Sequence, residues 1–215
     1  MALAFGSADE QVVATETLGA TESREALPAL RRAATSRLRD VRGAAVCGIE
    51  DIGQAEPRLA VAELTALSQD HRPEVRRDAY SVLFHHNRIA GSALDEALPD
   101  TLLRGLTDSD PGCRRLAAWG TVRRWGSWHQ DETRLREALQ ACLLGPSPPP
   151  YCNPSGQPGS ASDGHYVAEL ARGLHAPWSH ERCKALVGLW EEGTPRSRQI
   201  VREYLAQHPL AEARR

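Results

Sequence analysis

The chain contains 215 residues, which is enough for one domain with a continuous core or for a short array of structural repeats. Hydrophobic residues make up 41% of it and charged residues 25%, and these values exclude wholesale disorder. The formal net charge of −2 excludes a molecule that is basic overall, so a site for nucleic acid or an anionic membrane would have to be a local patch.

The start of the chain is small, polar and acidic, and we expect residues 1–22 to form a flexible N-terminal arm. It lacks the basic start and the apolar run of a signal peptide, and no stretch approaches the ~18 apolar residues of a membrane span. The five Cys residues are odd in number and widely spaced, which favours reduced thiols over a disulfide framework. These features predict a cytoplasmic protein without membrane contacts.

From residue 23 onward the apolar residues recur with a helical period, and no alternating strand pattern is convincing. We therefore expect residues 23–215 to form a single all-α domain. Residues 145–162 are rich in Pro and Gly and predict a long loop between two helices. Helices are predicted over 24–39, 40–53, 57–69 and 93–107, and others begin at Pro73, Pro111, Asp131, Asp163, Ser179 and Thr194.

Two segments share one frame, which consists of Leu, an acidic turn, Pro, a small apolar residue, Arg-Arg and Ala. The first runs from Leu67 to Ala79 and the second from Leu106 to Ala117, with an offset of 38 residues between Pro73 and Pro111. Pro suits the first position of a helix, where no backbone N–H is needed. The small apolar residue and the Ala are four residues apart and share one helical face. The frame predicts a repeated helical hairpin.

This frame resembles that of the HEAT-repeat family, and the resemblance covers roughly residues 55–126, weakening on either side. It implies a HEAT-like α-solenoid of about four to five helical hairpins. In that family an Asp in the turn and an Arg six residues later link neighbouring hairpins in a ladder. The resemblance therefore implies a structural role for two pairs with this spacing, Asp70 with Arg76 and Asp108 with Arg114.

We predict no metal ion, cofactor or catalytic residue. The His and Cys residues lack the tight spacing of zinc ligands, and we interpret Cys183 as a core residue next to a surface His180. Deoxyhypusine hydroxylase is similar at the level of the fold, but it binds two irons through several His-Glu pairs. This chain has a single such pair, His180-Glu181, which cannot assemble that site. Phosphate-binding loops and nucleophile motifs are absent from the sequence.

The enzymatic alternative is a DNA glycosylase, because some bacterial alkylpurine DNA glycosylases resemble the chain in fold class. Such enzymes need a basic face, aromatic side chains and a catalytic carboxylate. Asp110 and Asp131 are the nearby carboxylates, although Asp110 is also suited to capping a helix. The net charge and the near-absence of Lys argue against this function. The basic and aromatic residues concerned are Arg114, Arg115, Arg123, Arg124, Arg134, Arg136, Trp119, Trp125 and Trp128.

Recognition of another macromolecule is the preferred interpretation, because stacked hairpins present an extended concave surface lined by their second helices. Arg, Trp and Tyr, which dominate interface hot spots, lie away from the apolar faces of these helices. Packing between hairpins is an equal alternative for the individual residues. We predict a non-enzymatic adaptor or scaffold that binds a protein, of an immunity or regulatory type, with nucleic acid as a second choice. The candidate partner-binding residues are Arg77, Tyr80, Phe84, Arg88, Arg115, Trp119, Arg123 and Arg124.

Overall fold

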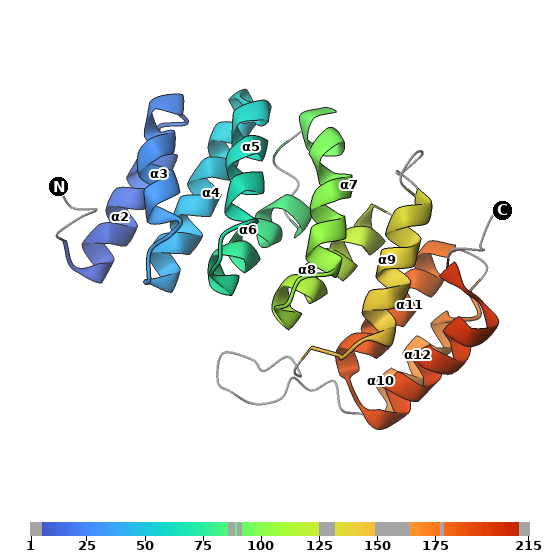
Figure 1. Ribbon diagram of the computed structural model, residues 1–215. Coiled ribbons are helices and arrows are strands. Elements are labelled where there is room, and N and C mark those ends of the chain that lie inside the picture. Colours follow the sequence, from blue (N-terminus) through green and yellow to red (C-terminus); the bar gives the residue numbers. More distant parts are fainter. Residues whose placement is uncertain are drawn as a thin grey trace. The chain divides into compact units, whose positions relative to one another are not determined.

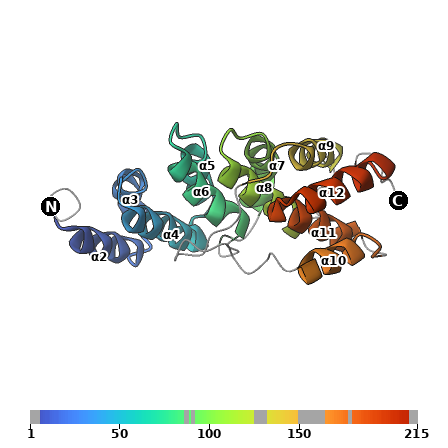
Figure 2. The ribbon, with the colours of Figure 1, turned by 90° about the horizontal axis from the view of Figure 1, so that it is seen from below.

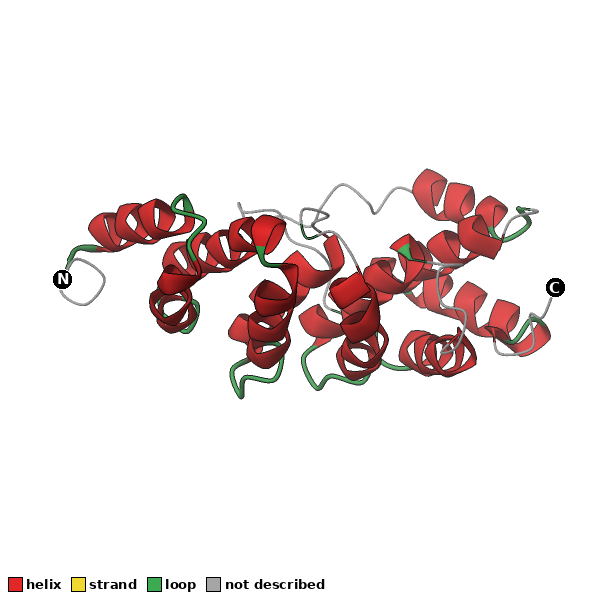
Figure 3. Cartoon of the chain, turned by 90° about the horizontal axis from the view of Figure 1, so that it is seen from above, coloured by secondary structure: helices red, strands yellow, loops and turns green. Residues whose placement is uncertain are grey.

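A computed structural model describes residues 6–85, 89, 92–124, 132–148, 164–176 and 179–210. Within these ranges every regular element is a helix, which confirms the all-α prediction (Figures 1 and 3). None of the helices described there is long and apolar enough to cross a bilayer. The chain divides into two compact units, residues 1–101 and 102–215, and the division falls inside helix α7.

The first unit is organised around helix α4, which packs against α2, α3, α5 and α6. Figure 2 shows α3 and α5 in one layer of this unit and α2, α4 and α6 in the other. The side chains at its centre are fully buried, among them those of Leu30, Ile49, Ile52 and Leu64. Its elements are α2 (Ala8–Gly19), the short 3-10 helix η1 (Arg24–Ala26), α3 (Leu27–Ala33), α4 (Arg39–Ala55), α5 (Pro57–Leu67), α6 (Pro73–His85) and the first part of α7 (Ser92–Leu106).

Helix α2 corrects the prediction of a flexible arm over residues 1–22, of which residues 1–5 lie outside the described ranges. Ser7 caps this helix: its hydroxyl accepts a hydrogen bond from the Glu10 N–H, and the Glu10 carboxylate accepts one from the Ser7 N–H. The helix packs on α4 through two glycines, since a methyl group added to Gly19 would come within 2.7 Å of the Gly48 Cα. Because backbone rather than large apolar side chains makes this contact, hydrophobic periodicity did not indicate it.

The predicted first residue of most helices lies within one residue of the observed first residue. The helix predicted over 24–39 differs most from the structure. It consists of η1 and α3, and α3 ends at Ala33 because residues 34–38 form the turn that precedes α4. The glycines of α4, Gly43 and Gly48, do not interrupt the helix. Gly48 admits α2 and touches Leu30, whereas a methyl group at Gly43 would meet no atom within 4 Å.

The second unit is organised around helix α11, which packs against α8, α9, α10 and α12. Its buried side chains include those of Leu139, Leu186 and Trp190. Of the Pro/Gly-rich segment predicted as a loop, residues 145–148 are irregular, and residues 149–162 lie outside the described ranges. The elements are the last part of α7, α8 (Pro111–Arg123), α9 (Glu132–Leu144), α10 (Gly164–Gly173), α11 (Ser179–Glu192) and α12 (Pro195–Gln207).

Candidate functional site

One turn construction occurs in both hairpins whose sequences match. In the α5–α6 hairpin, Arg76 donates through Nη1 to the carbonyl oxygens six and five residues before it, at 2.9 and 3.1 Å. In the α7–α8 hairpin, Arg114 does the same at 2.8 and 3.0 Å. The residues six positions earlier are Asp70 and Asp108, so the predicted spacing corresponds to an arginine that fastens its own turn through backbone carbonyls. A link between neighbouring hairpins by these two pairs stays a prediction.

A third copy of this turn joins α3 to α4, and sequence comparison missed it. Arg42 donates through Nη1 to the carbonyl oxygens of Ser36 and Arg37, both at 3.1 Å. This segment lacks the acidic turn and the Pro of the frame, which is why it was overlooked. The small apolar residue, Arg and Ala are nevertheless present as Val41, Arg42 and Ala45, and a search for this shorter frame would have found them.

The carboxylates of the matched turns shape the backbone. Asp70 accepts from the N–H of Arg72 at 2.9 Å, and Asp108 accepts from the N–H of Asp110 at 2.8 Å. The Arg72 guanidinium also donates to Asp70 at 2.9 and 3.0 Å and holds the pKa of that carboxyl down to about 2. Asp110 caps α8 by accepting from the N–H of Cys113 at 2.9 Å. The two turns therefore share the hydrogen bond from the Asp carboxylate to the N–H two residues later.

Neighbouring hairpins of the first unit are joined by arginines of the turns. Arg42, whose side chain is 8% exposed, places Nε 2.8 Å from the Asp78 Oδ2 on α6. Arg72 donates through Nη1 to the carbonyl oxygen of Thr35, in the preceding hairpin turn, at 2.7 Å. These contacts connect α4 with α6 and one turn with the next, and neither was predicted as a pair.

The candidate partner-binding residues of α6 divide between surface and core. Arg77 is exposed. Tyr80 and Phe84 are 1% and 4% exposed, and their rings stack with centroids 5.1 Å apart. The two aromatic residues therefore follow the packing alternative, because a partner could not reach them without opening the core. Arg88 lies outside the described residues.

Two of the candidates on α8, Arg115 and Trp119, contact a glutamate that was not predicted. Trp119 donates through Nε1 to the Glu191 Oε2 of α11 at 2.9 Å, and the Arg115 Nε lies 3.7 Å from the Glu191 Oε1. Glu191 follows Trp119 by 72 residues, so no local pattern indicates the contact. Burial raises the pKa of the adjacent Glu192, and the Glu191 charge raises it further. Of the other candidates on α8 and just after it, Arg123 is exposed and Arg124 half-buried.

The residues considered for a glycosylase have other contacts where they are described. Asp110 and Arg114 form the α7–α8 turn, and Arg136 donates to the carbonyl oxygen of Leu210 at 3.5 Å. Arg134 is exposed on α9. Trp125, Trp128 and Asp131 lie outside the described ranges.

The predicted core cysteine is buried where the sequence placed it. Cys183 is 1% exposed, and burial raises the pKa of its thiol. His180, at the start of α11, is half-buried. In the part of the chain that the structure describes, His, Cys, Asp and Glu side chains form no group of three or more that could hold a metal ion.

The described part of the chain is all-helical, and an arginine fastens three of its hairpin turns in the same way. No protein-family model matches the sequence, and no curated protein is detectably similar to it.

Proposed function

We propose that the chain is a HEAT-like α-solenoid that acts as a non-enzymatic adaptor and binds another protein. The observation that carries the proposal is the recurrence of one arginine-fastened turn before α4, α6 and α8. A repeated turn gives successive hairpins a repeated geometry, and stacked hairpins present their second helices as an extended binding surface. In this arrangement α4, α6 and α8 are second helices.

The chemistry of the candidate residues favours an acidic partner surface. Arg77 on α6 and Arg123 on α8 are exposed, and Arg124 directly after α8 is half-buried. Guanidinium groups bind carboxylates in a bidentate manner and are enriched in interface hot spots. A protein that covers an acidic active surface, such as an immunity-type or regulatory partner, is consistent with this chemistry.

The proposal is tested by site-specific photo-crosslinking in cells of the source organism. A photoreactive amino acid replaces Arg77 or Arg123, and a matched control replaces the exposed Arg58 on α5. We expect one discrete protein adduct at position 77 or 123 and none at 58. The purified partner should then bind the wild-type chain, and Arg123→Glu combined with Arg124→Glu should weaken that binding about tenfold or more, with the melting temperature nearly unchanged.

Two kinds of outcome contradict the proposal, one from the binding experiments and one from an enzyme assay. One is adduct formation that does not differ between the candidate and control positions, or reconstituted binding that survives the double charge reversal. The other is excision of alkylated purines from duplex DNA by the purified chain, which would replace the adaptor with the enzymatic alternative.

A further inference from the structure

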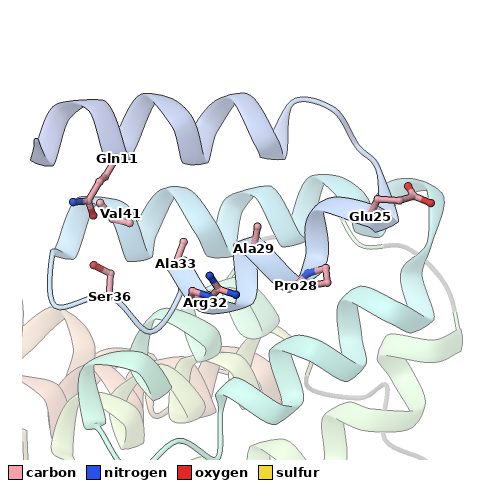
Figure 4. Close-up of a pocket in the computed structure, with 8 residues that line it drawn as sticks. All are labelled: Gln11, Glu25, Pro28, Ala29, Arg32, Ala33, Ser36 and Val41. Carbon is pink, nitrogen blue, oxygen red and sulfur yellow. The ribbon is translucent and has the colours of Figure 1, made fainter. Parts of the chain in front are cut away.

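A pocket of about 430 Å³ lies in the first unit, between α2, α3 and the start of α4 (Figure 4). Pro28, Ala29 and Ala33 of α3 and Val41 of α4 form its apolar lining. Small residues on two successive turns of α3 leave the space open. Its volume is within the range of sites that accept small ligands or single large side chains.

The polar lining is arranged unevenly along the pocket. Figure 4 shows Gln11 and Ser36 at one end, Glu25 at the opposite end and Arg32 between them. The Ser23 hydroxyl hydrogen-bonds to the Glu25 carboxylate and lowers its pKa, which favours the negative charge at that end. The pocket therefore offers hydrogen-bonding groups and a cation over one part and an anion at the other end.

Three arginines lack a carboxylate partner within the described residues: Arg32, which lines the pocket, and Arg37 and Arg39, which follow the lining residue Ser36 in the sequence. The side chains of Arg32, Arg37 and Arg39 are exposed and form no ion pair or hydrogen bond there. Arg37 and Arg39 belong to the segment between Ser36 and Val41, two residues that line the pocket. The three residues differ in this respect from the nearby Arg31, Arg42 and Arg72, which pair with Glu63, Asp78 and Asp70.

We propose that this pocket binds an acidic, amphipathic peptide segment of a partner protein. One large apolar side chain of the peptide fills the space over Ala29 and Ala33, and its carboxylates pair with Arg32 and with the arginines of the α3–α4 turn. The proposal depends on charge complementarity, since guanidinium groups form their strongest hydrogen bonds with carboxylates and phosphates. The site is separate from the α6 and α8 residues discussed above and goes beyond the function proposed for them.

The pocket fits a peptide better than a nucleic acid. Among the described residues that line it, none has an aromatic side chain on which a base could stack. Glu25 would repel a phosphate backbone that followed the length of the pocket. These features also give the peptide a direction, with its acidic residues near Arg32 and Ser36 and none near Glu25.

The experiment selects peptides from a random 12-residue mRNA-display library against the full chain and measures the enriched peptide by fluorescence anisotropy. We expect a consensus with one large apolar residue and at least two Asp or Glu residues. Arg32→Glu reverses the central charge and Ala29→Phe fills the pocket, so each should weaken binding about tenfold or more.

Matched controls come from α5, where Arg58 and Ala62 line a second pocket of about 550 Å³. Arg58→Glu and Ala62→Phe make the same chemical changes at exposed positions of the same unit and should leave the affinity unchanged. Arg123→Glu with Arg124→Glu should also leave it unchanged, which separates this proposal from the proposed function. Thermal melting monitors the fold of each variant, and Arg32→Glu, an exposed substitution, keeps the test valid if Ala29→Phe proves unstable.

Four results would overturn the proposal. The library could enrich no peptide or one without acidic residues, or the enriched peptide could bind Arg32→Glu and wild type equally well. Tight binding of a 20-base-pair duplex DNA that is lost on Arg32→Glu, with a steep dependence on salt, would assign the pocket to nucleic acid instead.

Discussion

The two units both contain helices that begin with Pro or a polar residue and carry Arg three residues later, but only some of these arginines fasten a turn. In the first unit Arg42 and Arg76 do so, and in the second Arg114 does. Arg182 on α11 and Arg198 on α12 occupy the corresponding position and form no such bond with any described residue.

The length of the preceding turn explains the difference for α12. Only Gly193 and Thr194 separate α11 from α12, so the residue six positions before Arg198 is still helical. The three fastened turns contain four or five residues between their helices. An arginine at this position therefore fastens the turn only where the turn is long enough for its carbonyl groups to point back toward the arginine.

The largest effect should come from the contact between Gly19 and Gly48 in the first unit. A methyl group at Gly48 would lie 2.9 Å from the Gly19 Cα, so Gly48→Ala should lower the free energy of unfolding by about 2 kcal/mol. Gly43→Ala in the same helix meets open space and should be neutral or stabilising by up to about 1 kcal/mol. Urea unfolding measures both variants, and equal effects would mean that α2 does not pack closely on α4.

In the second unit the corresponding test is the Trp119–Glu191 contact. Glu191→Ala leaves the Trp119 N–H without its acceptor and should cost about 1–2 kcal/mol of unfolding free energy. Glu191→Gln keeps an acceptor and loses only the Arg115 ion pair, so it should cost less than about 1 kcal/mol. Chemical denaturation compares the two variants. A larger loss in the Gln variant would show that charge, not the hydrogen bond, holds α8 to α11.

A smaller effect, with a defined pH dependence, is expected for Asp70. Its pKa is lowered to about 2 by Arg72, so its ionised form stabilises the fold above the ordinary carboxyl pKa of about 3.9. That stabilisation is lost as the pH falls toward 2. Asp70→Asn should cost about 1 kcal/mol at pH 7, after allowance for solvent screening, and only a small part of that at pH 2.

The Asp70–Arg72 pair is isolated by a double-mutant cycle. Arg72→Gln alone should cost at least as much as Asp70→Asn, because it also removes the bond to the Thr35 carbonyl. Adding Asp70→Asn to Arg72→Gln should then have little further effect at pH 7. Full additivity of the two substitutions would contradict the assigned cause of the pKa shift.

The last prediction concerns the thiols, and it is a difference in the rate of alkylation and not in stability. Burial raises the pKa of Cys142 to about 12, and Cys183 is shifted in the same direction, whereas Cys47 is half-buried. Because the thiolate is the reactive form, iodoacetamide at pH 8 should label Cys47 faster than the other two. Peptide mass spectrometry measures the three rates, and equal rates would show that the second unit opens readily.

Local chemistry made most helices predictable from sequence, whereas contacts between distant residues were not. Pro73, Pro111 and Pro195 start helices because Pro needs no N–H partner there, and each helix begins within one residue of the predicted start. Helix α2 was missed because Gly19 and Gly48 make its contact without apolar side chains.

The contacts of the candidate site were less predictable because they depend on residues that are far apart in the sequence. Tyr80 and Phe84 were expected with equal weight in the core or at an interface, and tertiary packing decided for the core. No local sequence pattern indicated the role of Glu191, because its partners precede it by more than 70 residues. Ser36–Arg42 was missed because the comparison required an acidic turn and a Pro, although only the arginine and its small neighbours are common to all three turns.

The most direct test of this account replaces each turn arginine by Lys and measures urea unfolding. In each turn the Nη1 atom donates both bonds, and the Lys ammonium lies one atom closer to the backbone than Nη1 does. Arg42→Lys, Arg76→Lys and Arg114→Lys should therefore each lower the free energy of unfolding by about 1 kcal/mol or more. Arg198→Lys, at the equivalent position after a short turn, should change it by less than about 0.5 kcal/mol. Unchanged stability in the first three variants, or an equal loss at Arg198, would contradict the claim that one repeated turn builds this protein.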